Sequence, residues 1–193
     1  MNKLLIGCLA LFGTIFSSCG ENKTEAAMKN ENNKVLVVYF SATGTTEKVA
    51  KEIASATNGR LFEIEPENKY TSADLNWNNR NSRSSVEMND MSSRPAIKNG
   101  IVNLDSIETV FIGYPIWWDQ APRVINTFID SNNLKGKRII TFCTSGGSTI
   151  EGSTRALCET YPDLDITQGK CLNGTSESGI EAWIKSLGLP NNY

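Results

Sequence analysis

The sequence predicts an α/β fold with a doubly wound parallel sheet, and three observations support this prediction. Residues 35–40 are an unbroken apolar run rich in β-branched side chains, which is typical of a strand covered on both faces, and residues 109–113 indicate a second buried strand. Segments with the apolar period of a helix follow these runs. The chain has 193 residues, of which 39% are hydrophobic and 21% charged, and this suits one compact core. Strands that alternate with helices in this way favour right-handed crossovers.

The first half of the domain contains a predicted strand, helix and strand. The strand at residues 35–40 is followed by a predicted helix over residues 45–57, which Gly59 is expected to end. One face of that helix carries Val49, Ala50, Ile53, Ala54 and Thr57. Residues 61–65 alternate in character and stop at Pro66, which indicates a short strand near the sheet edge.

The second half continues the alternation after a long polar segment. Residues 67–100 are rich in Asn and Ser, so we expect a long surface connection with at most one short helix. Residues 109–113, 138–142 and 166–172 are the remaining predicted strands. The helices between and after them present Val124, Ile125, Phe128 and Ile129, then Ile150, Thr154, Leu157, Cys158 and Tyr161, then Ile180, Trp183, Ile184 and Leu187. Five strands are therefore predicted.

The amino end has the features of an export signal. Lys3 precedes an apolar run over residues 4–16, which is too short to span a bilayer of roughly 30 Å as a mature helix. Small residues then lead into Cys19, and this pattern resembles the lipobox of bacterial lipoproteins, although Phe16 stands where Leu is preferred. The resemblance implies lipidation of Cys19 and anchoring of the exported protein to the bacterial cell envelope, on its periplasmic or outer-membrane face. An ordinary signal peptide cut near Ser18 is the alternative.

These features divide the chain into three parts. Residues 1–18 are the predicted signal peptide, residues 19–33 a polar tether without apolar period, and residues 34–193 the α/β domain. Three cysteines remain in that domain, Cys143, Cys158 and Cys171, so at most one disulfide can form among them. Their spacing favours no pair.

Composition also excludes several classes of function. The chain has no histidine, which rules out a Ser-His-Asp triad, a Cys-His dyad and any histidine metal ligand, so no metal site is predicted. Its net charge of −2 and the lack of a Lys/Arg cluster argue against a nucleic-acid partner, because such binding needs a concentrated basic surface.

The first candidate site is the segment after the first strand, residues 41–46, here called the first loop. Ser41, Thr43, Thr45 and Thr46 supply four hydroxyls around Gly44, immediately before a helix N-terminus. Free backbone N–H groups and the helix dipole favour an anion there, and hydroxyls add donors. An ordinary helix cap is the alternative. The segment lacks the Gly-Lys-Ser/Thr ending of a P-loop and the Gly-x-Gly-x-x-Gly of a dinucleotide site.

An apolar strand followed by Ser-x-Thr-Gly-x-Thr resembles the phosphate loop of flavodoxins and flavodoxin-like FMN proteins. The resemblance extends from about residue 35 to residue 187. It implies a three-layer sandwich with a five-stranded parallel sheet in the order 2-1-3-4-5, and FMN as the cofactor. Ligands in such sheets bind beyond the carboxyl ends of the strands, where the strand order reverses.

Two further loops fit the resemblance. The second loop, residues 113–122, contains Pro115, Ile116, Trp117 and Trp118 and looks like the first isoalloxazine loop of the family. An aromatic side chain held by prolines suits a flat ring, and because adjacent turn residues rarely point the same way, we expect one tryptophan on the flavin and the other beneath it. Two tryptophans packed into the core are the alternative.

The third loop, residues 144–148, resembles the second isoalloxazine loop. Its small residues allow backbone N–H groups to approach a ligand closely, and the expected contacts are Thr144, Ser145, Gly146 and Gly147. It lacks the tyrosine that many flavodoxins place there, so that side of a flavin is expected to be open. A plain glycine turn is the alternative. A cysteine-dependent phosphatase at Cys143 is rejected because Thr149 stands where that mechanism needs an arginine.

The residues and the resemblance together predict an FMN-binding redox protein. It would carry electrons or reduce a quinone-like acceptor, with donor and acceptor unassigned, and no side chain is predicted to be catalytic because the flavin carries the chemistry. A binding or scaffold lipoprotein that keeps the fold without redox turnover is the alternative.

Overall fold

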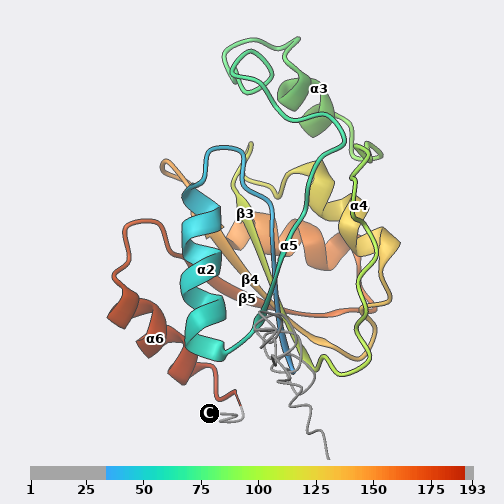
Figure 1. The fold of residues 1–193 in the computed structure, drawn as a ribbon. Coiled ribbons are helices and arrows are strands. Elements are labelled where there is room, and N and C mark those ends of the chain that lie inside the picture. Colours follow the sequence, from blue (N-terminus) through green and yellow to red (C-terminus); the bar gives the residue numbers. More distant parts are fainter. Residues whose placement is uncertain (1–33, 190–193) are drawn as a thin grey trace, which may run out of the picture. The chain divides into compact units, whose positions relative to one another are not determined.

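A computed structural model of the protein describes residues 34–189, which form one five-stranded parallel sheet (Figure 1). The strand order is β2-β1-β3-β4-β5, and every neighbouring pair runs parallel. This confirms the predicted order. The strands are β1 (Val35–Tyr39), β2 (Arg60–Glu63), β3 (Thr109–Pro115), β4 (Arg138–Thr144) and β5 (Asp165–Cys171).

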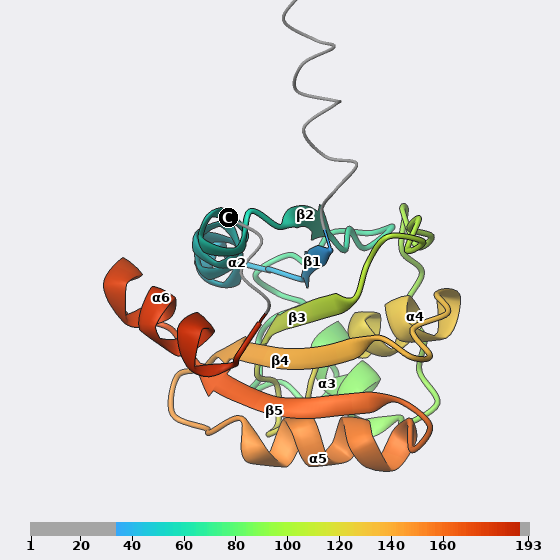
Figure 2. The ribbon, with the colours of Figure 1, turned by 90° about the horizontal axis from the view of Figure 1, so that it is seen from below.

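Helices cover both faces of the sheet and give the predicted three layers (Figure 2). Helices α2 (Thr45–Thr57) and α6 (Glu177–Ser186) pack against each other on one face. Helices α4 (Arg123–Ser131) and α5 (Glu151–Thr160) lie on the opposite face. The short helix α3 (Arg83–Asn89) belongs to the connection between β2 and β3 and is the one short helix expected there.

The position of each strand in the sheet explains how clearly the sequence predicts it. Central strands β3 and β4 are buried along almost their whole length, so their sequences are continuous apolar runs. The edge strands β2 and β5 alternate between more and less exposed residues, which accounts for their weaker sequence signals. The prediction that the strand after α2 lies at an edge is confirmed.

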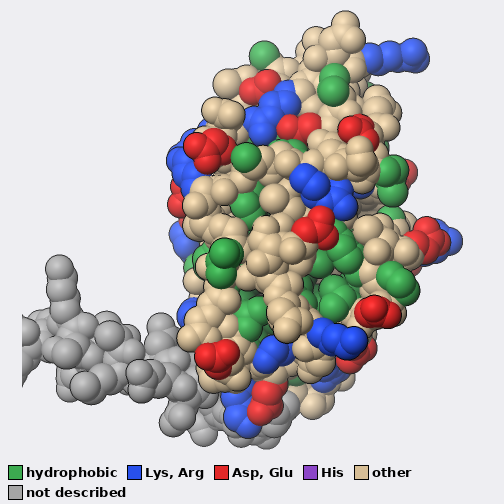
Figure 3. Space-filling view, turned by 90° about the vertical axis from the view of Figure 1, so that its right-hand side faces the viewer, with side chains coloured by type: hydrophobic (Ala, Val, Ile, Leu, Met, Phe, Trp, Pro, Cys, Tyr) green, Lys and Arg blue, Asp and Glu red, His purple; other side chains and the backbone are tan. Residues whose placement is uncertain are grey.

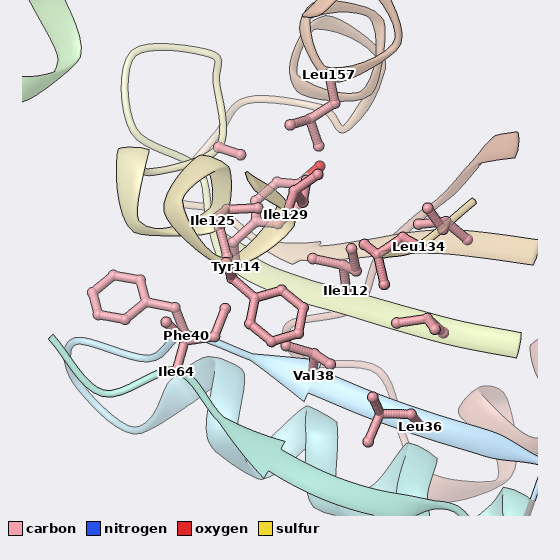
Figure 4. Packing of buried hydrophobic residues seen from close by; sticks show 14 of the residues in the cluster. Leu36, Val38, Phe40, Ile64, Ile112, Tyr114, Ile125, Ile129, Leu134 and Leu157 are labelled. Carbon is pink, nitrogen blue, oxygen red and sulfur yellow. The ribbon is translucent and has the colours of Figure 1, made fainter. Parts of the chain in front are cut away.

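Two hydrophobic clusters fill the space between the layers. The larger joins β1 and β3 to α4 and α5, and Figure 4 shows Leu36 and Val38 of β1 and Ile112 of β3 with Ile125 and Ile129 of α4. The smaller lies between the sheet and α2 and α6. Gly113 of β3 makes this packing possible, because a Cβ there would lie 2.0 Å from the ring of Phe142.

The helix α2 begins and ends at left-handed residues. Its N-cap is Gly44, with φ 87°, and its C-cap is Asn58, with φ 47°. The expected end at Gly59 is therefore displaced by one residue, because Asn tolerates the left-handed conformation that closes a helix.

No helix within residues 34–189 has the length and apolar character needed to cross a bilayer. The predicted signal peptide, Cys19 and the whole predicted tether lie outside the described residues, so those assignments stay predictions.

Candidate functional site

The three predicted loops meet at the carboxyl edge of the sheet. The hydroxyl oxygens of Thr46 and Thr144 lie 2.8 Å apart and join the first loop to the end of β4. The backbone N–H of Ile116 donates to the carbonyl of Thr144 at 2.9 Å, which joins the second loop to the third. The three loops thus converge at the carboxyl edge of the sheet, where they were expected.

The first loop leaves the start of α2 open. Ser41 Oγ accepts a hydrogen bond from the backbone N–H of Gly44 at 3.0 Å, which fixes the turn. No side chain caps α2, so the N–H groups of its first turn face outward, as an anion requires. Thr43 and Thr45 are exposed, whereas Thr46 is 1% exposed. The Thr43 and Thr45 hydroxyls are therefore the accessible ones, and Thr46 faces Thr144.

The second loop contains a tight turn in a strained conformation. Trp117 and Gln120 exchange backbone hydrogen bonds of 3.0 and 2.9 Å around Trp118 and Asp119. The two central residues have φ of 47° and 58°, a pair of left-handed conformations that bulky side chains seldom adopt. Such strain persists only where the surroundings impose it, and it is concentrated at ligand sites.

That turn separates the two tryptophans. Trp117 packs edge-on against Phe40 and Tyr70, with ring centroids 5.6 and 5.1 Å away. Trp118 is 43% exposed. The structure therefore gives the two tryptophans different surroundings, with Trp117 half-buried and Trp118 on the surface. Which of them contacts a flavin stays a prediction.

A cavity of about 410 Å³ opens between the first two loops and the connection from β2 to β3. It is lined by Ala42, Thr43, Leu75, Trp77, Ser84, Pro115, Ile116, Trp117 and Trp118. Five of these are predicted site residues. The other predicted residues, Ser41, Gly44, Thr45, Thr46, Thr144, Ser145, Gly146 and Gly147, lie in the same three loops but outside the cavity lining.

The sequence prediction missed Leu75, Trp77 and Ser84. They come from the polar segment 67–100, which rises past the carboxyl edge of the sheet with α3 (Figure 1). Trp77 is 72% exposed. The available signal was a lone tryptophan in an Asn-rich stretch.

Tyr70 ties this connection to the second loop. Its ring packs on Trp117, its hydroxyl donates to Glu87 of α3, and the Arg83 guanidinium lies 4.1 Å from its ring centroid. Arg83 and Glu87 form an ion pair of 2.7 Å. Burial and the Glu87 carboxylate raise the pKa of Tyr70, so the phenol stays neutral.

Arg123 is a second residue that links the β2–β3 connection to the second loop, and its side chain is buried, with 3% exposed. Its guanidinium donates to the carbonyl of Met88 and to Gln120 Oε1, at 3.0 and 3.1 Å. It thus joins the end of α3 to the strained turn of the second loop. Burial lowers the pKa of Arg123, but a guanidinium remains charged, and it lies beside helix-end carbonyls that favour a cation.

The backbone of the third loop is held by the side chain of Asn173. The side chain of Asn173 accepts from the Ser145 N–H and donates to the Ser145 carbonyl, each at 3.0 Å. Gly146 and Gly147 are exposed, and a Cβ at either would meet nothing within 4 Å. Their backbone is therefore accessible to a ligand.

A doubly wound sheet with an open helix start, an aromatic turn and a glycine loop at one edge defines the class of flavodoxin-like α/β proteins. The chain belongs to the flavodoxin family, because the family model described as Flavodoxin matches residues 34–187.

Solved structures agree with this assignment. A candidate flavoprotein from Bacteroides eggerthii is 54% identical, with a TM-score of 0.78 over 82% of this chain and 99% of that one. One from Bacteroides uniformis is 48% identical, with a TM-score of 0.78 over 80% and 99%. A Lactobacillus acidophilus flavoprotein in complex with FMN is 22% identical, with a TM-score of 0.60 over 79% and 99%, and supports the fold alone. No curated protein matches.

Proposed function

We propose that this protein is an FMN-dependent redox protein of the cell envelope that reduces a small planar acceptor of the quinone type. The observation that carries the proposal is that Thr43, just before the open start of α2, and the exposed Trp118 border one apolar-walled cavity. Membership of the flavodoxin family supports FMN as the cofactor. When bound, FMN supplies one- or two-electron transfer at its ring.

The residues at the site suit both ends of FMN. The first loop offers backbone N–H groups and the exposed hydroxyls of Thr43 and Thr45 to a phosphate. The cavity is within the size range of small-molecule sites, and Trp118 offers an exposed aromatic face to a flat ring. Gly146 and Gly147 leave backbone groups accessible for polar ring atoms.

The chain's own residues bind and position rather than react. Trp117, fixed by Phe40 and Tyr70, supports the turn that presents Trp118. Leu75 and Trp77 add apolar walls to the cavity. A planar aromatic acceptor matches such walls better than a charged one does.

Charge favours this reading over a soluble electron shuttle. Shuttles of this family present a strongly acidic docking face, whereas the net charge here is −2. On the face in Figure 3, basic and acidic side chains are interspersed. The apolar run over residues 4–16 and the small residues before Cys19 support export and a lipid anchor, which would place the domain beside a membrane acceptor.

Flavin binding is tested by titrating the purified protein with FMN and following fluorescence quenching. The double variant Thr43→Val, Thr45→Val removes two donors while keeping shape. A loss of about 1.5–3 kcal/mol for each bond to a charged group predicts that FMN binds at least about a hundredfold more weakly. Thr160→Val is the control, because its hydroxyl bonds only within α5. Unchanged affinity in the double variant would show that the first loop is only a helix start.

Redox turnover is tested by adding NADH or NADPH and a soluble quinone to the FMN-loaded protein without oxygen. Quinone reduction above that of free FMN, lowered by Trp77→Ala, is expected. Reduction equal to free FMN would contradict the reductase assignment. Protein that neither binds FMN nor carries flavin when isolated from the envelope would favour the scaffold alternative.

A further inference from the structure

Two cysteines far apart in the sequence are neighbours at the end of the sheet. Cys143 of β4 and Cys171 of β5 are register partners, and theirs is the last pair of the β4–β5 ladder. Neighbouring strands lie about 4.7–4.9 Å apart, which falls within the roughly 4.4–6.8 Å between Cα atoms that a disulfide spans. The end of a ladder is also where strands adjust most easily, because no further pair constrains them.

Both side chains lie on the same face of the sheet. Cys143 is fully buried in the larger hydrophobic cluster, and Cys171 packs against that cluster from a partly exposed position. Burial and the adjacent Cys171 thiol raise the pKa of Cys143. The third cysteine, Cys158 of α5, instead points its thiol at the carbonyl of Ile166, with sulfur and oxygen 3.7 Å apart.

We propose that Cys143 and Cys171 form a reversible disulfide that acts as a redox switch behind the third loop and loosens that loop when it forms. The oxidant is a small-molecule or protein disulfide. The Cys171 thiolate attacks one of its sulfurs and releases one thiol, and the Cys143 thiolate then attacks the mixed disulfide at Cys171 and releases the second. Two protein thiols are oxidised, one external disulfide is reduced to two thiols, and the two protons pass to the departing thiolates.

The order of attack follows from exposure. Cys171 is partly exposed and accessible to an external disulfide, whereas Cys143 is buried and favours its neutral thiol. The second step is therefore the slow one, although its two sulfurs are held side by side by the ladder.

The pair is connected to the third loop through one asparagine. The Cys171 thiol donates to Asn173 Oδ1 at 3.1 Å, and the same amide makes both hydrogen bonds to Ser145. Forming the disulfide removes the thiol proton from this chain of bonds and draws Cys171 toward β4. Asn173 Oδ1 then no longer accepts a hydrogen bond from Cys171. The amide of Asn173 loses one of the bonds that orient it, so its hold on Ser145 weakens.

The bond itself is tested by treating the full-length protein with excess oxidised glutathione and digesting it with trypsin. Cleavage places the three cysteines in separate peptides, residues 139–155, 156–170 and 171–185. Mass spectrometry is expected to find the first and third linked, with the loss of two hydrogens, and dithiothreitol to separate them. Cys158→Ser should preserve the link, whereas Cys143→Ser and Cys171→Ser should abolish it. Glutathione adducts without a linked peptide would overturn the proposal.

The effect on the loop is measured without FMN, so that it does not depend on the proposed cofactor. Hydrogen exchange of peptides covering residues 144–148 is expected to be about fivefold faster in the oxidised protein, which corresponds to the loss of roughly one hydrogen bond. Cys171→Ser treated with the same oxidant is the control and should show no such change. Equal exchange in the oxidised and reduced wild type would overturn the link to the loop.

Discussion

The hydroxyls of Thr46 and Thr144 lie 2.8 Å apart, and both residues are buried. One belongs to the first turn of α2 and the other ends β4, so a single hydrogen bond joins two of the three loops of the site. Each side chain is 5% exposed or less, and neither hydroxyl has ready access to water as a substitute.

Thr46→Val and Thr144→Val are each expected to destabilise the protein, because each leaves the partner hydroxyl buried without this bond. A loss of about 1–3 kcal/mol is expected for either variant in urea unfolding. The loss of unfolding free energy in the double variant should be smaller than the sum of the two single losses, because the double variant leaves no hydroxyl buried without its partner. Strict additivity would mean that the two side chains do not interact.

Gly44→Ala is expected to destabilise the start of α2 through backbone strain alone. Gly44 has φ 87°, and a Cβ there would meet nothing within 4 Å, so alanine would cause no steric clash with its surroundings. The left-handed backbone conformation alone should cost alanine about 1–2 kcal/mol of stability. Gly146→Ala is the matched control, because it also has open space but no positive φ. The check is thermal unfolding of both variants, and equal losses would refute the strain argument.

Arg123→Met is expected to loosen the connection that carries Trp77. It removes the donors to the Met88 carbonyl and to Gln120, and buried acceptors left without a donor cost about 1–3 kcal/mol. Faster hydrogen exchange over residues 83–91 should accompany the lower stability. Arg155→Met on the exposed side of α5 serves as control and should change neither quantity. Unchanged exchange in Arg123→Met would show that the guanidinium does not hold α3.

The buried phenol of Tyr114 should make the protein less stable to unfolding at alkaline pH. Burial raises its pKa to about 12, whereas in the unfolded chain it ionises near 10. Its contribution to stability is therefore fully present below about pH 10 and is lost as the pH rises through 12, since the unfolded chain releases the proton first. Relative to its own value near neutral pH, Tyr114→Phe should lose about 1 kcal/mol less than the wild type at about pH 11 in urea unfolding. Parallel losses in the two proteins would contradict this.

The sequence predicted those parts of the fold whose signals are local. Buried strands such as β3 are continuous apolar runs because both of their faces are covered, and α2 shows its buried face as a helical period. The first loop was recognisable because an anion site at a helix start uses neighbouring residues of the chain. For the same reason the carboxyl edge of the sheet could be named as the location of the site.

The wall formed by Leu75, Trp77 and Ser84 could not be predicted, because residues 67–100 have no periodic pattern. Tertiary ties place that segment: Tyr70 on Trp117, and Arg123 between α3 and Gln120. Which tryptophan faces outward was equally hidden, since it depends on the left-handed turn at Trp118 and Asp119.

By itself, then, the sequence determined the alternation of strands and helices, the anion-binding character of the first loop and the edge at which a ligand would bind. Only the tertiary structure decided which residues wall the cavity, which tryptophan is exposed and which two cysteines are partners. The physical reason is the range of the interactions. Hydrophobic periods and helix starts involve residues a few positions apart, whereas Cys143 and Cys171 meet only because β5 pairs with β4 in one particular register.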